Sequence, residues 1–193
     1  MKSFFGFHLL NLSTISLYME TLLSGQDVYN ILGEEIPIVT SSHIQNASSL
    51  HDIFRGGNKA LVLYDSKKNG TTYVGHWCAL LLNKDGISFY DPYGHFIDDQ
   101  LDYIPKDYRK KTKQIKGALS RLIYHSPFDK VHYNPHKHQN IRNSATCGRH
   151  CALFLKYEEE PEKYNDFLQY ASKYLGVPTD KASYLITKKI IGK

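Results

Sequence analysis

The chain has 193 residues, of which 41% are hydrophobic, 22% charged and 13% aromatic, with a formal net charge of +5. These values exclude a disordered or fibrous protein, and the length predicts a single domain, residues 1–193, with one sizeable core. No apolar run approaches the ~20 residues that a membrane-spanning helix needs, so we expect no contact with a membrane. The segment Met1–Leu10 lacks a small-residue cleavage site after its apolar residues, so we expect it to belong to the fold and the protein not to be secreted.

The cysteines Cys78, Cys147 and Cys151 are an odd number without the spacing of a disulfide scaffold. They indicate a reducing compartment and at least one free thiol. A buried cysteine is more often a small hydrophobic residue than a nucleophile, and we expect Cys78 and Cys151 to be core residues of this kind.

The first predicted element is a short helix. Ser24, followed three residues later by Asp27, is typical of a capping box. The apolar positions then run to Leu32, and Gly33 is expected to end the helix.

A sheet built on a hairpin is predicted next. Ala60–Tyr64 is rich in strand-forming residues, and Ser66–Gly70 is expected to form a turn. Thr72–Leu82 is apolar at nearly every position, which is typical of a strand covered on both faces. Asn83–Gly86 has hairpin-turn chemistry, and Ile87–Tyr90 is expected to return as the partner strand.

The second half is predicted to be mainly helical. Asp98–His125 is expected to be mixed but mostly helical, with apolar residues at helical spacing at Ile115, Leu119, Leu122 and Ile123. Lys130–Tyr133 suits a further strand. Helices are expected from near Cys147, over Pro161–Leu175 and over Lys181–Ile190. The order of elements predicts an α+β fold with a central mixed β-sheet flanked by helices.

The predicted hairpin brings His76 and Asp91 together. His76 lies in the buried strand, and Asp91 follows the end of the partner strand. Pairing of the two strands places the carboxylate within reach of the imidazole. A carboxylate so placed holds the ring in one tautomer and stabilises the imidazolium.

Cys147 lies where a polar loop meets an apolar helix. The positive end of the helix dipole and a neighbouring protonated histidine both favour its thiolate, which is the reactive form. The backbone N–H of Cys147 is free to bind a developing oxyanion, and a side-chain amide just upstream, from Gln139 or Asn140, would supply a second donor.

Two other features are open to more than one interpretation. A basic run between positions 106 and 116 suits either a solvated helix face or contact with nucleic-acid phosphates, and it consists of Lys106, Arg109, Lys110, Lys111, Lys113 and Lys116. A zinc site is an alternative for the histidines and cysteines His125, His132, His136, His138, Cys147, His150 and Cys151. Paired Cys and His ligands usually lie closer together, in loops, so we predict no metal.

Three strings of residues carry a family resemblance. They are His76-Trp77, Phe-Tyr-Asp-Pro-Tyr-Gly at positions 89–94, and Asn-Ser-Ala-Thr-Cys-Gly at positions 143–148. In these the chain resembles the adenain-like maturation cysteine proteases of adenoviruses, virophages and Polinton-like elements, from about Leu23 to about Tyr157. The order histidine, acid, amide, cysteine is also that of the wider group that contains the ubiquitin-like-protein proteases.

The resemblance implies a protease fold of that type and a role for each site residue. Cys147 would be the nucleophile, His76 the base and Asp91 the orienting acid, where adenain has a glutamate. Aligned without gaps, Asn140 takes the position of the oxyanion glutamine, whereas Gln139 takes it after one inserted residue. Gln139 is preferred for its chemistry, and Asn140 stays as the alternative.

The resemblance also implies a biological setting. The expected substrates are viral capsid and core precursor proteins, cut after Gly in small-residue motifs during maturation, in the virion interior and the infected host cell. A monomer that needs no cofactor for its chemistry is expected, with possible activation by viral DNA or a peptide. A disulfide-linked peptide activator is not expected, because no cysteine lies between Cys78 and Cys147.

Two further hypotheses compete with this one. A deconjugating protease that acts on ubiquitin-like modifiers would use the same catalytic residues. A basic nucleic-acid binding module would need none of them, and its binding would depend steeply on salt.

Overall fold

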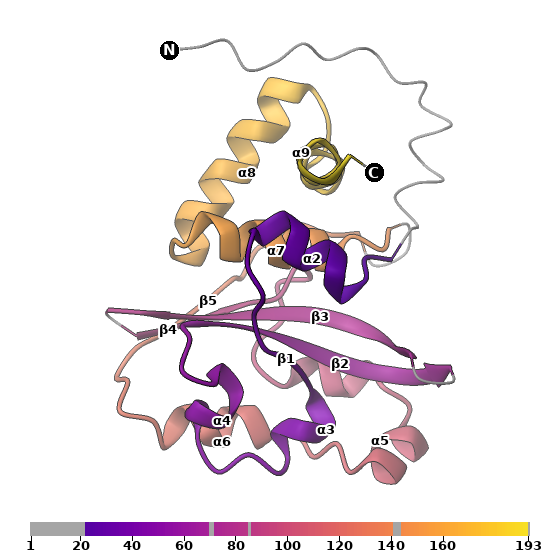
Figure 1. Cartoon of the computed structure of the whole chain (residues 1–193), viewed down its shortest axis with the longest axis vertical. Coiled ribbons are helices and arrows are strands. Elements are labelled where there is room, and N and C mark those ends of the chain that lie inside the picture. The colour runs from indigo at the N-terminus through magenta and orange to yellow at the C-terminus, as the bar shows by residue number, and fades with distance from the viewer. Residues whose placement is uncertain (1–21, 70–71, 85, 141–143, 193) are drawn as a thin grey trace.

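The computed structural model describes residues 22–69, 72–84, 86–140 and 144–192, so the expectation for Met1–Leu10 lies outside the described residues. The described residues form an α+β fold with a five-stranded mixed sheet between two layers of helices (Figure 1), as predicted. One layer contains α2 (Gly25–Leu32), α7 (Cys147–Tyr157), α8 (Pro161–Leu175) and α9 (Thr179–Ile191). The other contains α3 (Ser41–Ile44), α4 (Leu50–Phe54), α5 (Lys106–Thr112) and α6 (Ala118–Tyr124).

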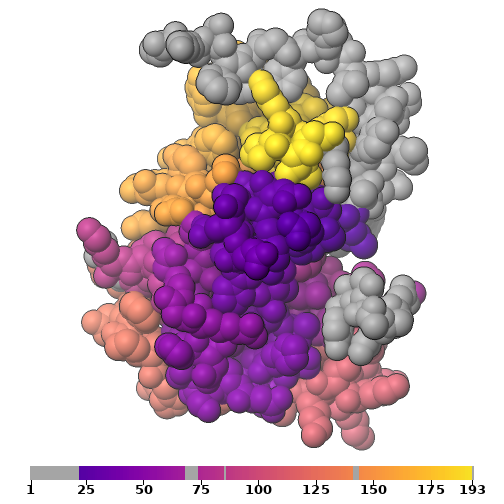
Figure 2. Space-filling model, in the orientation of Figure 1, coloured from indigo at the N-terminus to yellow at the C-terminus, as the bar shows by residue number. Residues whose placement is uncertain are grey.

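The strands follow one another across the sheet in chain order. They are β1 (Ile38–Thr40), β2 (Lys59–Asn69), β3 (Thr72–Asn83), β4 (Gly86–Tyr90) and β5 (Val131–Tyr133). The three central strands are antiparallel, and each edge strand pairs in parallel with its neighbour. In Figure 2 the segment from α2 to α4 occupies the centre of the visible face, and α8 and α9 lie above it.

Both faces of the sheet are buried, as predicted for the central strand. Cys78 and Leu80 of β3 pack with α3, α4 and α6 in one core cluster. Ala79 and Leu81, which alternate with them, pack with α2, α7 and α8 in the other. The alternation follows from the two-residue period of a strand.

The helix caps are confirmed. Ser24 and Asp27 form the capping box of α2, and Gly33 ends this helix in the left-handed conformation, at φ 84°. Helix α8 has the predicted bounds, Pro161–Leu175, and α9 begins two residues before the predicted Lys181. All helices in the described ranges are too short or too polar to cross a bilayer.

Two predictions about local structure are wrong. Residues Ser66–Asn69 continue β2 instead of forming a turn, because Lys67 and the two residues after it pair with β3 beyond a bulge that follows Asp65. Residues 98–125 are mostly helical, as predicted, but Ile115 does not lie on a helix with Leu119, Leu122 and Ile123.

Ile115 falls between two of the helices in this stretch. A 3-10 helix, η1 (Asp99–Tyr103), precedes α5, and Lys113 ends α5 in the left-handed conformation. Ile115 is 58% exposed and is not in a helix, because α6 begins only after Gly117, which has a φ of 89°.

Candidate active site

A cavity of about 310 Å³ lies where β3, the loop after β4 and the start of α7 meet. Its lining includes His76 from β3, Tyr93 and Gln100 from the residues after β4, and Gln139 and Cys147 from the second half of the chain. Four of the predicted site residues therefore lie close together. His76, Gln139 and Cys147 line the cavity, and Asp91 is hydrogen-bonded to His76.

The hairpin register positions His76 and Asp91. Ala79 pairs with Tyr90, so Asp91 follows directly at the level of Cys78, two residues from His76. His76 Nε2 lies 2.8 Å from Asp91 Oδ1, and the Asp91 side chain is fully buried. The predicted imidazole–carboxylate pair is therefore present.

Further hydrogen bonds hold Asp91 in place. The Tyr93 N–H donates to Oδ1 (2.7 Å), and Gln100 Nε2 donates to Oδ2 (3.0 Å). Asn134 Nδ2 donates to the Asp91 main-chain oxygen (2.7 Å). The Asp-Pro-Tyr string, typical of an Asx turn, indicates the first of these contacts. Gln100 and Asn134 were missed, because no spacing in the sequence marks them.

The surroundings of His76 favour its protonated form. Burial disfavours the charged ring, but the charge and hydrogen bond of Asp91, together with the nearby Cys147 thiol, raise the pKa of His76 from 6.5 to about 9. The Tyr93 ring stacks on the imidazole at a centroid distance of 4.1 Å and fixes its plane. His76 Nδ1 is buried and has no hydrogen-bond partner among the described residues.

Cys147 is the first residue of α7, so it lies at the positive end of the helix dipole, as predicted. Its side chain lines the cavity, although the residue is only 4% exposed. Cys78 and Cys151 are buried core residues, and burial raises the pKa of both thiols well above the ordinary value. Of the three cysteines, Cys147 is the one that lines the cavity.

The structure brings Gln139 to the cavity and leaves Asn140 outside its lining. Gln139 is 2% exposed, and its Nε2 donates to the Ser144 main-chain oxygen (2.8 Å). The side-chain oxygen of Gln139 is buried without a hydrogen bond to any described residue. Asn140 is exposed.

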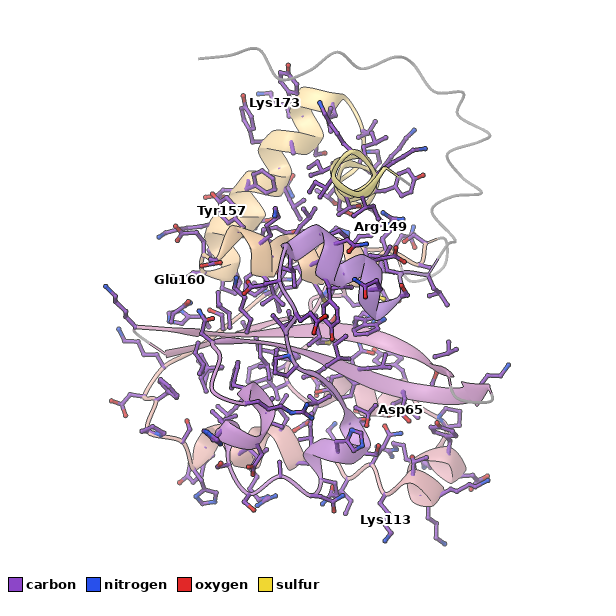
Figure 3. The ribbon with its side chains drawn as sticks, viewed as in Figure 1. Asp65, Lys113, Arg149, Tyr157, Glu160 and Lys173 are labelled. Carbon is purple, nitrogen blue, oxygen red and sulfur yellow. The ribbon has the colours of Figure 1, made fainter. Side chains whose placement is uncertain are left out.

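The basic run lies on the other face of the sheet from α7, on α5 and the residues that follow it (Figure 1). In Figure 3 the side chain of Lys113 points away from the sheet. Lys116 binds Asp102 (2.7 Å) and Asp99 (3.6 Å), so acidic neighbours partly neutralise the run.

The residues proposed for the zinc alternative do not converge. Within the described ranges, one group of three potential metal ligands has its atoms within 4.8 Å of one another: His76, Cys78 and Asp91. None of the seven residues of the zinc alternative belongs to it, and His76 Nε2 is directly hydrogen-bonded to Asp91.

A larger cavity, of about 480 Å³, lies near Lys59 and the start of β1. Its lining, as far as the structure describes it, contains neither histidine nor cysteine. Lys59 binds Glu34 (2.5 Å) and Glu158, so its charge is neutralised. His76, Gln139 and Cys147 therefore line the smaller cavity and not this one.

Comparison with known proteins places the chain beside a virophage protein. No family model matches it. Over 179 residues it is 32% identical to the uncharacterized protein V9 of Sputnik virophage, and the match covers 90% of this chain and 98% of V9. The chain therefore belongs to the same protein family as V9 of Sputnik virophage.

Proposed function

We propose that the protein is a cysteine endopeptidase of the adenain type, with Cys147 as nucleophile, His76 as base and Asp91 as the orienting carboxylate. One observation carries most weight: His76 lines the same cavity as Cys147, and the buried carboxylate of Asp91 is hydrogen-bonded to Nε2 of His76. Thiol, imidazole and carboxylate in this order are the parts of a thiol protease site.

In the proposed mechanism, each nitrogen of His76 has its own role. Nε2 is used by Asp91, so Nδ1 is the atom that exchanges a proton with the Cys147 thiol. The resulting thiolate attacks the scissile carbonyl carbon and forms a C–S bond. When the C–N bond breaks, the imidazolium protonates the leaving amine. Water, deprotonated by His76, then cleaves the thioester and restores the thiol.

In the proposed mechanism, two donors bind the oxyanion of the tetrahedral intermediate. The backbone N–H of Cys147 is in the first turn of α7, where N–H groups lack partners within the helix. Gln139 Nε2 carries two hydrogens, and its bond to Ser144 uses one of them. Together they would form an oxyanion hole.

The proposed substrates are viral capsid and core precursor proteins, cut after Gly during virion maturation. Membership of a family with a virophage protein supports a viral setting. The maturation role itself comes from the resemblance of the three strings at His76, Asp91 and Cys147. In the same proposal, the exposed lysines of α5 are the surface that viral DNA would contact.

The experiment incubates the purified protein with the capsid proteins encoded in the same genome and sequences the new N-termini. New termini that follow Gly, formed by the wild type and not by Cys147→Ala, would support the proposal. Unchanged capsid proteins together with turnover of a fluorogenic ubiquitin-like substrate would favour a deconjugating protease instead. Inactivity on both, with tight salt-sensitive DNA binding, would favour the nucleic-acid binding module.

A further inference from the structure

Asp180 lies in the first turn of α9 and contacts the residues before Cys147. It is 7% exposed. Its carboxylate accepts hydrogen bonds from the hydroxyls of Ser144 and Thr146 and from the main-chain N–H of Asn140 (3.2 Å). One carboxylate from the C-terminal helix thus binds three residues on the approach to Cys147.

A histidine completes the environment of this carboxylate. His150 Nε2, from the first turn of α7, lies 3.3 Å from Asp180 Oδ1 and 3.2 Å from the Ser183 hydroxyl. Burial raises the pKa of Asp180, but the hydrogen bonds from His150, Ser144 and Thr146 outweigh it and hold the pKa below 3.8. Asp180 is therefore ionised at neutral pH, and a charged acceptor makes stronger hydrogen bonds than a neutral one.

We infer that Asp180 is a positioning residue for the oxyanion donors of the proposed peptidase. Gln139 Nε2 donates to the main-chain oxygen of Ser144, whose hydroxyl is bound by Asp180. Thr146, also bound by Asp180, is the N-cap of the helix that begins at Cys147. The Gln139 amide and the Cys147 N–H are therefore both next to residues that are hydrogen-bonded to the same charged carboxylate, that of Asp180. This inference rests on the proposed function.

The packing of α9 against α7 keeps that charge in place. Arg149 of α7 is buried and directed towards α9 (Figure 3). Its Nη1 donates to Thr187 Oγ1 (2.8 Å), and its guanidinium lies 4.7 Å from the centroid of the Tyr184 ring. In addition, Thr179 Oγ1 donates to the main-chain oxygen of His138 (3.1 Å), the residue before Gln139. The C-terminal helix is thus part of the support of the site.

The test uses the full chain with Asp180→Asn and, independently, Thr146→Val. Turnover is measured on an internally quenched peptide with Gly before the scissile bond. We expect kcat to fall on the order of 10- to 100-fold while KM changes less than about threefold, because misplaced donors affect the transition state more than substrate binding. Thr146→Ser, which restores the hydroxyl, should rescue most of the rate. Asp166→Asn, at an exposed carboxylate of α8, is the control and should match the wild type.

A second readout does not depend on activity. Hydrogen exchange of the amides at residues 144–147 should accelerate at least about tenfold in Asp180→Asn and Thr146→Val, and stay unchanged in Asp166→Asn. Folded variants with wild-type kcat and wild-type exchange would overturn the inference. If the wild type cleaves nothing, the proposed function fails, and the exchange result alone decides whether Asp180 fixes these residues. If Asp180→Asn does not fold, Thr146→Val carries the test.

Discussion

His76 Nε2 and Asp91 Oδ1 lie 2.8 Å apart, and Nδ1 of the same ring is buried without a hydrogen bond to any described residue. The carboxylate is fully buried and is itself held by the Tyr93 N–H and Gln100. Because the carboxylate cannot turn away, the ring has one orientation. Catalysis and the titration of the ring should therefore both depend on this pair.

Replacement of the proposed nucleophile should abolish turnover without unfolding the protein. Cys147→Ala and His76→Ala should each lower kcat on the order of 10³-fold or more, since each removes a member of one catalytic unit. Peptide hydrolysis measures the rate, and circular dichroism checks the fold. Iodoacetamide should inactivate the wild type through Cys147, as identified by mass spectrometry.

The matched control for this prediction is Cys151→Ser. Cys151 Sγ donates to the Trp77 main-chain oxygen (3.2 Å), and a serine hydroxyl can make the same bond. We expect this variant, and likewise Cys78→Ser, to retain turnover. Equal loss of activity in all the cysteine variants, with the fold intact, would leave Cys147 without support as the nucleophile.

The titration of His76 should follow its raised pKa of about 9. The folded state then binds the proton more tightly than the unfolded chain, whose histidine titrates near 6.5. The resulting contribution to stability is complete below about pH 6.5 and is lost as the pH rises through 9. Nitrogen-15 NMR of the ring measures the value directly.

The same titration tests the cause of the raised pKa. Asp91→Asn should lower the pKa of His76 by more than one unit, because burial then acts without an opposing charge. Asp107→Asn, at an exposed carboxylate on α5, should leave the pKa of His76 unchanged. An unshifted titration in Asp91→Asn would mean that the pair does not control the ring.

Gln139 and Asn140 should differ sharply in their effect on catalysis. Gln139 lines the cavity, so Gln139→Ala should lower kcat on the order of 10²- to 10³-fold, as expected when an oxyanion donor is removed. Asn140 is exposed, and Asn140→Ala should change kcat less than about threefold. Steady-state kinetics with the quenched peptide measure kcat for both variants. A larger loss of kcat in Asn140→Ala than in Gln139→Ala would indicate that Asn140 is the oxyanion donor.

The lysines of α5 should determine affinity for nucleic acid. Lys110→Glu combined with Lys111→Glu should weaken binding of duplex DNA and reduce the slope of log affinity against log salt by about one for each phosphate that is no longer neutralised. Fluorescence anisotropy at several salt concentrations measures both effects. Lys163→Glu on α8 is the control, and equal weakening there would argue against a localised DNA surface.

Much of the sheet could be predicted because its signals are local. The turn chemistry at residues 83–86 and the apolar run of Thr72–Leu82 indicate the hairpin register, and this register brings Asp91 to within two residues of His76 along the sheet. The sequence also predicts that Cys147 starts α7, because polar residues precede it and apolar residues at helical spacing follow it. Errors arose where pairing with another strand outweighed turn propensity, at Ser66–Asn69.

Local patterns thus determined the hairpin, the helix caps and the residue types of the site. The tertiary structure alone decided that Gln139 and not Asn140 enters the cavity, and that Gln100, Asn134 and Asp180 bind the groups around it. Gln139 and Asn134 come from loops, Gln100 from η1 and Asp180 from α9, and none of their contacts follows the spacing of a helix or a strand. No periodicity records such contacts, because they exist only once helices have packed on the sheet and buried polar atoms must find partners.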